Sequence, residues 1–186
     1  MKKNVLIVED ESIVAMDIQQ SLINLGYEVL GIASSGKKAI EYLGKRTKPD
    51  IILMDIMMPE MDGYETCKRL KADGVHLGQG DGDVSEAREL LGRDAQIGVT
   101  CHNSRHLAME AGDAGADYVA FGSFFPSSTK ESEHRPGLDL LEWWQEMMEI
   151  PCVAIGGITV NNAPPLVEAG ADFLAVSAGV WRAEGG

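Results

Sequence analysis

The sequence lacks any apolar run of the roughly 18 residues that a helix needs to cross a bilayer. It is also poor in positive charge. Only 16 lysines and arginines stand against 29 aspartates and glutamates, which gives a formal net charge of -13. A surface of this sign repels nucleic acid and anionic membranes, so we expect neither as a partner.

Cysteine is scarce as well. The three cysteines, Cys67, Cys101 and Cys152, are odd in number and far apart, which argues against a disulfide framework and for a reducing, cytoplasmic setting. The N-terminal apolar stretch Val5–Val8 is too short for a secretory signal. We therefore expect a cytoplasmic protein whose thiols are small buried side chains.

What the sequence does contain is a regular alternation of apolar strands and amphipathic helices. Strands are expected at Val5–Val8, Tyr27–Ala33, Asp50–Ile56, Gly74–Leu77, Gln96–Thr100, Asp117–Phe121, Cys152–Ile155 and Phe173–Val176. Helices are expected at Ser12–Leu25, 37–43, Tyr64–Lys71, Ser85–Leu91, Ser104–Ala111, Leu138–Met148 and Asn162–Ala169. In the first helix, the spacing predicts that Ile13, Met16, Ile18 and Leu22 face inward. Such alternation is typical of right-handed βαβ units and a parallel sheet.

A short repeat supports this architecture. The segments Ala114–Asp117 and Ala169–Asp172 both read Ala-Gly-Ala-Asp, and each closes a helix and opens a strand, which predicts equivalent corners. Eight parallel strands can close into a (βα)8 TIM-barrel-like barrel that leaves no open edge. The expected fold is therefore a closed α/β barrel whose last outer helix is missing, with an open doubly wound sheet as the alternative.

Three carboxylates mark the ends of two expected strands. Glu9 and Asp10 follow the first strand, and Asp55 ends the third. Because the carboxyl ends of parallel strands meet at one edge, the three side chains should converge. Carboxylate oxygens are the ligands that a hard divalent ion such as Mg²⁺ prefers, so we expect a metal site.

These carboxylates are followed by Met57, Met58-Pro59 and Met61-Asp62-Gly63. With them, residues 1 to about 70 resemble the response-regulator receiver family. The resemblance implies a flavodoxin-like strand order 2-1-3, Asp55 as phosphoacceptor, and Glu9, Asp10 and the Met57 carbonyl as metal ligands. The hydroxyl residue and the lysine that receivers place on their fourth and fifth strands have no counterparts here. Asp55 is therefore expected to be vestigial as a phosphoacceptor.

Glycine-rich loops follow the seventh and eighth expected strands. Gly156-Gly157 closes one strand, and Ser177-Ala178-Gly179 closes the next. In barrels, the loops after these two strands commonly hold phosphate, because glycines allow backbone N–H groups to approach the anion. We therefore expect a phosphate or sulfate anion to bind there.

Five motifs follow one another after residue 72: Gly74–Asp81, Gly98–His102, Phe121–Lys130, Ala154–Ile158 and Val176–Gly179. In this order they resemble thiamine-phosphate synthase, over residues 72 to about 182. The resemblance implies that Thr100, Ser127, Thr129 and Lys130 contact a pyrophosphate, with Lys130 in a catalytic role, and that Asp81 is a Mg²⁺ ligand. Gly80 stands where the family usually has glutamate, and the family's first three strands, with their Gln-x-Arg group, are absent.

Three receiver-like strands and five synthase-like strands add up to the eight that a closed barrel needs. We therefore expect a single domain over residues 1–186, built from a receiver-like segment 1–71 and a synthase-like segment 72–186, with the ring order 2-1-3-4-5-6-7-8. The function expected from this reading is an engineered-looking chimera that retains phosphate and metal binding but has no efficient turnover. A thiamine-phosphate synthase-type transferase and a phospho-accepting receiver module are the alternatives.

Overall fold

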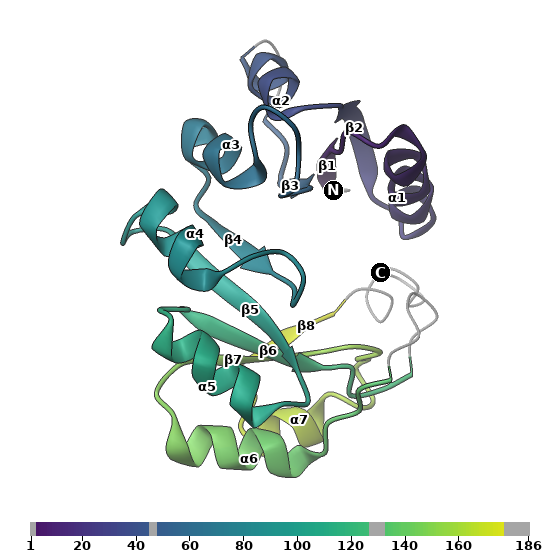
Figure 1. Cartoon of the computed structure of the whole chain (residues 1–186). Helices are drawn as coiled ribbons and strands as arrows, with labels where there is room; N and C mark the ends of the chain where they lie inside the picture. Colours follow the sequence, from purple (N-terminus) through teal and green to yellow (C-terminus); the bar gives the residue numbers. More distant parts are fainter. Residues whose placement is uncertain (1–2, 45–47, 127–132, 177–186) are drawn as a thin grey trace. The chain divides into compact units, whose positions relative to one another are not determined.

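The protein divides into two compact units, Met1–Asp73 and Gly74–Gly186. Its structure is a computed structural model that describes residues 3–44, 48–126 and 133–176 (Figure 1). The boundary lies close to the expected join of the two segments at residues 71 and 72. Within the described residues, no helix is long and apolar enough to cross a membrane.

The first unit is a three-stranded parallel sheet with a helix after each strand. Its elements are β1 (Asn4–Val8), α1 (Ser12–Asn24), β2 (Glu28–Ala33), α2 (Gly36–Leu43), β3 (Ile51–Met54) and α3 (Gly63–Leu70). The strands lie in the order β2-β1-β3, and both pairings are parallel. This confirms the flavodoxin-like order that the carboxylate motifs predicted for the first three strands.

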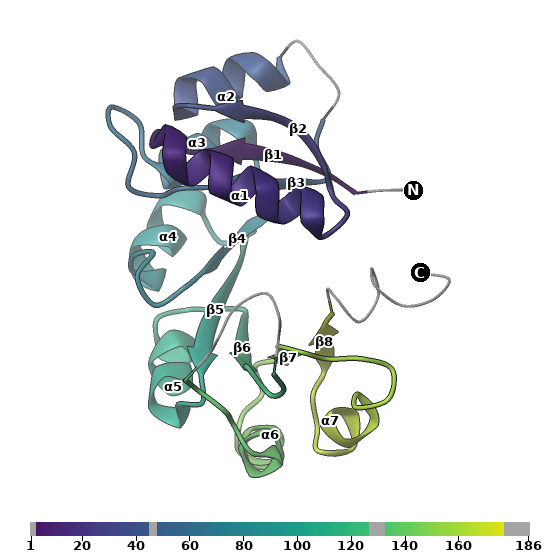
Figure 2. The same ribbon diagram turned by 90° about the vertical axis from the view of Figure 1, so that its right-hand side faces the viewer.

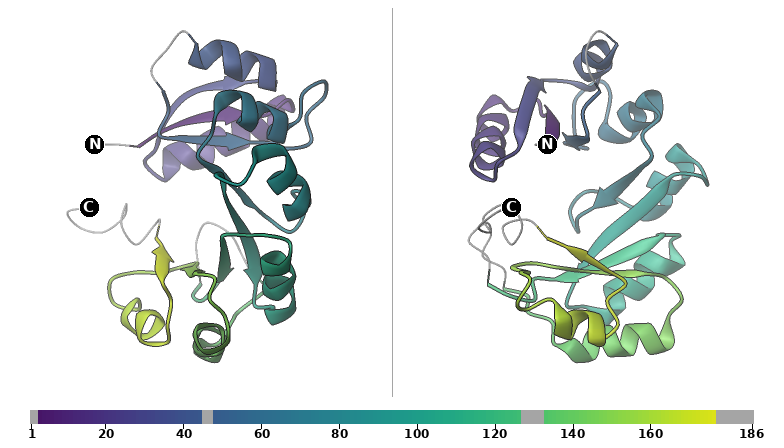
Figure 3. Two further views of the ribbon diagram at one scale, coloured as in Figure 1. Left: turned by 90° about the vertical axis from the view of Figure 1, so that its left-hand side faces the viewer. Right: turned by 180° about the vertical axis from the view of Figure 1, so that it is seen from behind.

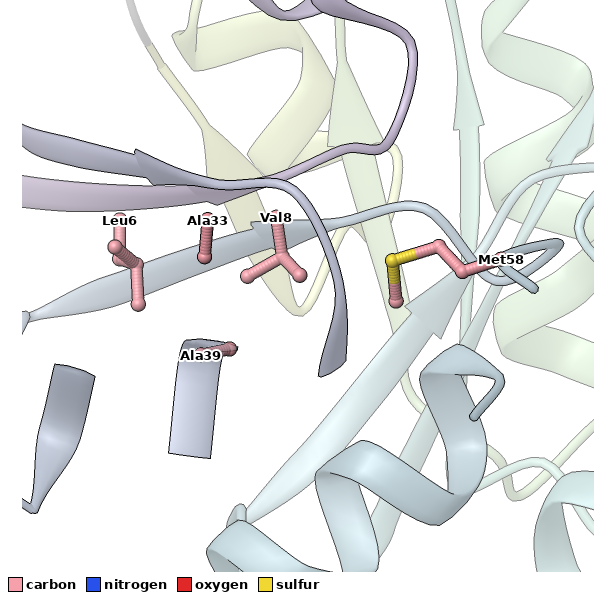
Figure 4. Packing of buried hydrophobic residues seen from close by; sticks show 5 residues of the cluster. All are labelled: Leu6, Val8, Ala33, Ala39 and Met58. Atoms are coloured by element: carbon pink, nitrogen blue, oxygen red, sulfur yellow. The ribbon is translucent and has the colours of Figure 1, made fainter. Parts of the chain in front are cut away.

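The helices of the first unit cover opposite faces of its sheet (Figure 2). On one face Val5 and Ile7 pack with Ala15 and Leu22 of α1. On the other face, which α2 covers, a second cluster contains Leu6, Val8, Ala33, Ala39 and Met58 (Figure 4). The order β2-β1-β3 requires this, because right-handed crossovers that run in opposite directions place their helices on opposite faces.

The inward face of α1 differs from the prediction. Ile13 and Met16 are 78% and 62% exposed, whereas Ala15 and Leu22 are buried. The buried stripe runs through Ala15, Ile18 and Leu22, which are spaced by three and four residues and so lie on one side of the helix. The prediction placed the larger side chains at positions 13 and 16 on the inner face, but the helix packs the smaller Ala15 against β1.

The second unit is a five-stranded parallel sheet. Its elements are β4 (Gly74–Leu77), α4 (Val84–Leu91), β5 (Gln96–His102), α5 (Arg105–Asp113), β6 (Tyr118–Gly122), α6 (Leu138–Met147), β7 (Cys152–Ile155), α7 (Pro164–Glu168) and β8 (Phe173–Ala175). The strands follow the chain order β4-β5-β6-β7-β8. Because every crossover runs in the same direction, all four helices lie on one face of the sheet (Figure 3).

The core of the second unit lies between its sheet and these helices. Ile97 and Phe121 point from the strands toward this side and are fully buried, as are Leu141, Trp144 and Leu166 of the helices. The opposite face of the sheet carries the alternate residues of each strand, since side chains alternate along a strand. Polar side chains of this helix-free face therefore come from β4, β5 and β6.

The repeated Ala-Gly-Ala-Asp corners are equivalent, as predicted. Asp117 donates its N–H to the Ile97 carbonyl and accepts the Ile97 N–H with its carboxylate. Asp172 makes the same two bonds with Cys152. In each corner the aspartate thus holds a residue at the start of the neighbouring strand and sets the register of the pair. Asp50 of the first unit does the same for Asn4.

The coarse fold class is confirmed as α/β with parallel sheets. The structure defines each sheet by itself, so the single domain and the closed eight-stranded ring stay predictions, as does the open alternative.

Candidate functional site

The three carboxylates of the first unit converge. Glu9, Asp10 and Asp55 each offer an oxygen, and these atoms all lie within 4.8 Å of one another. Parallel pairing produces this arrangement: the Asp55 N–H donates to Val8 at the end of β1, and the Glu9 N–H donates to Ala33 at the end of β2. The geometry brings together the three side chains that the sequence singled out.

Two of these carboxylates accept hydrogen bonds from backbone N–H groups nearby. Glu9 is buried and accepts the Glu11 N–H, and Asp55 accepts the Met57 N–H at 3.1 Å. The Met57 side chain is 81% exposed, so the residue contributes no apolar cover to the cluster. Three oxygen donors of like charge fit a hard divalent ion, which would offset their mutual repulsion.

The glycine loop after β7 packs closely against the chain that follows β6. Gly156 and Gly157 have φ values of 100° and 62°. A Cβ on Gly157 would lie 2.4 Å from the Pro126 carbonyl oxygen, and one on Gly156 would lie 2.1 Å from the Ser123 hydroxyl. The loop therefore requires glycine at both positions, for its backbone angles and for the close approach.

One hydrogen bond joins this glycine loop to the chain after β6, and another closes the glycine loop on itself. Phe125 donates its N–H to the Gly156 carbonyl at 3.1 Å, and the Asn162 amide donates to the Gly157 carbonyl at 3.0 Å. Six predicted site residues lie outside the described residues: Ser127, Thr129, Lys130, Ser177, Ala178 and Gly179. Anion binding by Gly156-Gly157 together with residues 177–179 therefore stays a prediction.

Thr100 belongs to a hydrogen-bonded group on the helix-free face of the second sheet. One ring nitrogen of His76, Nε2, lies 2.8 Å from the Thr100 hydroxyl. The other, Nδ1, lies 3.0 Å from the Tyr118 hydroxyl. Gln79 donates its side-chain N–H to the Thr100 carbonyl. Thr100 is thus held at its hydroxyl by β4 and at its backbone by the loop that follows β4.

Desolvation by neighbouring side chains shifts the ionisation of this group, even though His76 is an exposed residue. It lowers the pKa of His76, against a weaker opposing effect of the Asp81 charge, and it raises the pKa of Tyr118. Both side chains are therefore neutral near pH 7. Burial also raises the pKa of Cys101 to about 12 and that of Cys152 to about 11, so both thiols are unreactive packing groups.

Asp81, the expected metal ligand of the second unit, folds back onto its own loop. Its carboxylate accepts the Gly78 N–H at 2.7 Å, and Asp81 in turn donates its N–H to the Gly78 carbonyl. The turn holds Gln79 in position to reach Thr100. The sequence prediction of Asp81 as a metal ligand is not tested by this geometry.

Three residues of this group, His76, Gln79 and Tyr118, were not selected from the sequence. A signal for Tyr118 was present in Gly98, a glycine in the middle of a strand. Such a glycine often marks a place where another group approaches closely. A Cβ on Gly98 would lie 1.9 Å from Cζ of Tyr118, so the phenol ring lies directly over this position.

A comparison with known protein families agrees with this geometry. The family model described as thiamine monophosphate synthase matches residues 61–180. The chain belongs to this family. A second model, described as response regulator receiver domain, matches residues 5–79. The two matches are consistent with a fusion of a receiver-like segment and a synthase segment, and they overlap over residues 61–79, which include the boundary between the two units.

Individual relatives support the family. The chain is 66% identical over 132 residues to a thiamine-phosphate synthase of Erythrobacter litoralis, covering 70% of this chain and 62% of the relative. It is 56% identical over 145 residues to one of Rhodospirillum centenum, covering 78% and 68%. The chain thus spans about two thirds of the length of these relatives.

A solved structure resembles the whole chain. Thiamine phosphate pyrophosphorylase from Pyrococcus furiosus aligns with a TM-score of 0.58 at 26% identity, over 98% of this chain and 88% of that one. A FabK mutant from Thermotoga maritima aligns with a TM-score of 0.57 at 20% identity, which shows the fold alone.

The expectation of a chimera without efficient turnover is wrong. Relatives at 45–66% identity are thiamine-phosphate synthases, which favours the transferase alternative and does not support a protein that is not an enzyme. The absence of the family's first three strands does not outweigh this similarity, because β4–β7 keep the glycine loop and the Thr100 hydroxyl in defined positions.

Proposed function

We propose that this protein is a thiamine-phosphate synthase-type transferase that couples a pyrimidine pyrophosphate to a thiazole phosphate, with pyrophosphate as the leaving group. The observation that carries the proposal is the 66% identity over 132 residues to a thiamine-phosphate synthase. The helix-free face of the second sheet supplies the hydroxyl of Thr100, and the loop after β7 supplies a glycine turn. Both are suited to phosphate oxygens.

The proposed division of labour follows the resemblance of the sequence motifs to the family. The Gly156-Gly157 loop, with Ser177, Ala178 and Gly179, would bind the phosphate of the thiazole. Thr100, with Ser127, Thr129 and Lys130, would bind the pyrophosphate, and Lys130 would neutralise charge as it leaves. Mg²⁺, with Asp81 as a ligand, would supply further charge neutralisation on the pyrophosphate.

The direct test is to incubate the purified chain with the pyrimidine pyrophosphate, the thiazole phosphate and MgCl₂. We expect thiamine phosphate and pyrophosphate to form in equal amounts, detected by chromatography and by a coupled phosphate assay. A variant with Thr100→Val is the control for contaminating enzyme. Absence of product from the parent, at a detection limit below one turnover, would contradict the proposal.

A second candidate property belongs to the first unit. We propose that Glu9, Asp10 and Asp55 bind Mg²⁺, with the Met57 carbonyl as a further ligand. The convergence of three carboxylate oxygens within 4.8 Å supports this, because the donor set is all oxygen and carries the charge that a hard cation requires. Phospho-acceptance at Asp55 is not proposed, because the sequence has no counterpart of the lysine that receivers place on their fifth strand.

Replacing Asp55 with asparagine is expected to lower the Mg²⁺ affinity of the first unit by at least about tenfold, because one anionic ligand is lost. Titration calorimetry with MgCl₂ measures the change. The control is Asp17→Asn, which removes an exposed carboxylate from α1 of the same unit. In EDTA, Asp55→Asn is expected to match or exceed the parent in melting temperature, because the substitution relieves repulsion. Equal Mg²⁺ affinity in parent and variant would exclude the site.

A further inference from the structure

Three neighbouring strands of the second unit carry one row of residues across the helix-free face. His76 of β4 pairs with Gly98 of β5, and Gly98 pairs with Tyr118 of β6. Side chains in register on adjacent parallel strands point to the same face of the sheet. The row therefore places an imidazole and a phenol on either side of a residue that has no side chain.

The missing side chain of Gly98 allows the two outer residues to meet. A Cβ there would lie 1.9 Å from Cζ of Tyr118, so the phenol ring occupies the space above the glycine. The rings of His76 and Tyr118 have centroids 5.5 Å apart, and the Tyr118 hydroxyl lies 3.0 Å from Nδ1 of His76. The contact thus reaches across the full width of the intervening strand.

The second nitrogen of the imidazole faces Thr100, which lies two residues beyond Gly98 on the same face of β5. Its Nε2 atom is 2.8 Å from the Thr100 hydroxyl oxygen. The result is a chain of three groups, Tyr118–His76–Thr100, that ends at the hydroxyl assigned above to the pyrophosphate. Gln79 fixes the backbone of Thr100 independently, by donating to its carbonyl.

A neutral imidazole has one N–H donor and one acceptor nitrogen, so its tautomer decides the direction of the whole chain. If Nδ1 carries the proton, Nε2 must accept the Thr100 hydroxyl hydrogen, which is then unavailable to an anion. If Nε2 carries the proton, it donates to the Thr100 oxygen, and the hydroxyl hydrogen is free to point at an anion. Only the second arrangement makes Thr100 a donor to pyrophosphate.

The chemistry of the two hydroxyls favours that second arrangement. A phenol is the stronger acid and has a lone pair delocalised into its ring, so Tyr118 is a better donor than acceptor. The alcohol of Thr100 is the weaker acid and the better acceptor. The pairing in which Tyr118 donates to Nδ1, and Nε2–H donates to Thr100, satisfies both preferences.

We propose that Tyr118 is a positioning residue that holds His76 in its Nε2–H tautomer and thereby directs the Thr100 hydroxyl hydrogen at the pyrophosphate of the substrate. The inference rests on the proposed function for the identity of the anion. The tautomer of His76 is a property of the protein alone and is independent of the proposed function. This arrangement requires Gly98, because any larger residue at that position would displace the phenol ring.

The first experiment reads the tautomer directly. Nitrogen NMR of protein labelled at histidine distinguishes protonated from unprotonated ring nitrogens, and His76→Gln assigns the signal among the four histidines. We expect Nε2–H in the parent, and a mixture of tautomers in Tyr118→Phe, which keeps the ring over Gly98 but removes the hydroxyl. The control is Tyr42→Phe in the first unit, which loses a hydroxyl bond to the Leu30 carbonyl and should leave His76 unchanged.

The second experiment asks whether Tyr118 acts through Thr100. Titration with inorganic pyrophosphate is expected to show about threefold to tenfold weaker binding in Tyr118→Phe, the value of one hydrogen bond. In a Thr100→Val background the same change should have no further effect, because the hydroxyl it directs is gone. An equal loss in both backgrounds would show that Tyr118 does not act through Thr100.

The two experiments separate the inference from the proposed function. An Nδ1–H tautomer in the parent would overturn the inference even if the transferase is active. The parent could instead show an Nε2–H tautomer that depends on Tyr118 and yet bind no pyrophosphate. That result would support the role of Tyr118 in holding the tautomer and would count against the transferase. With substrates, Tyr118→Phe should raise the KM for the pyrimidine pyrophosphate or lower kcat, and leave the KM for the thiazole phosphate unchanged.

Discussion

Replacing Gly157 with alanine is expected to lower kcat/KM of the proposed transferase by about 100-fold, because misplacement of a substrate-positioning loop by an ångström has effects of that size. The added Cβ would lie 2.4 Å from the Pro126 carbonyl oxygen and 2.7 Å from that of Phe125. Both contacts are with backbone atoms, which cannot rotate away. The loop after β7, the chain after β6, or both must therefore move.

The matched control is Gly92→Ala. Gly92 also has a positive φ, of 89°, but nothing lies within 4 Å of a Cβ built on it. Both variants place alanine at a positive φ that glycine favours, at position 92 with a ψ of 179°, and only Gly157→Ala adds a steric contact with backbone atoms. Steady-state rates with both substrates measure the effect. Similar losses in the two variants would show that the loop after β7 has no special role in the reaction.

Replacing Trp144 with alanine is expected to destabilise the second unit by about 3–5 kcal/mol, the usual cost of truncating a large buried aromatic residue. Trp144 is 1% exposed, and its ring meets that of Phe121 edge to face at a centroid distance of 5.3 Å. Its indole N–H donates to the Ile150 carbonyl at 2.7 Å. The residue therefore joins α6 both to β6 and to the segment that leads into β7.

Urea unfolding followed by tryptophan fluorescence measures this change, because the three tryptophans, Trp143, Trp144 and Trp181, all belong to the second unit. Trp144→Phe separates the two contributions, since it keeps most of the packing and loses about 1 kcal/mol from the N–H bond. Trp143→Ala is the control. Trp143 is only half-buried and its ring stacks on Arg105 at 4.6 Å, so a much smaller loss is expected. Equal losses at 143 and 144 would contradict the assigned core.

The carboxylate cluster and the glycine loop could be predicted from the sequence because they depend on local position. Glu9, Asp10 and Asp55 each stand at the end of an apolar run, and parallel strands bring such ends to one edge. Gly156-Gly157 could be predicted because it directly follows the apolar run of β7. The hydrogen-bonded group around Thr100 could not be predicted in this way, because His76, Thr100 and Tyr118 come from three strands and meet only through their register.

The alternation of strands and helices, the equivalent aspartate corners and the family motifs can be read from the chain alone, since each follows from the periodicity or turn chemistry of a short segment. The buried face of α1 and the residues that line the helix-free face of the second sheet cannot, because both depend on contacts between distant segments. The ring of Tyr118 reaches His76 because Gly98, from the strand between them, leaves the space open.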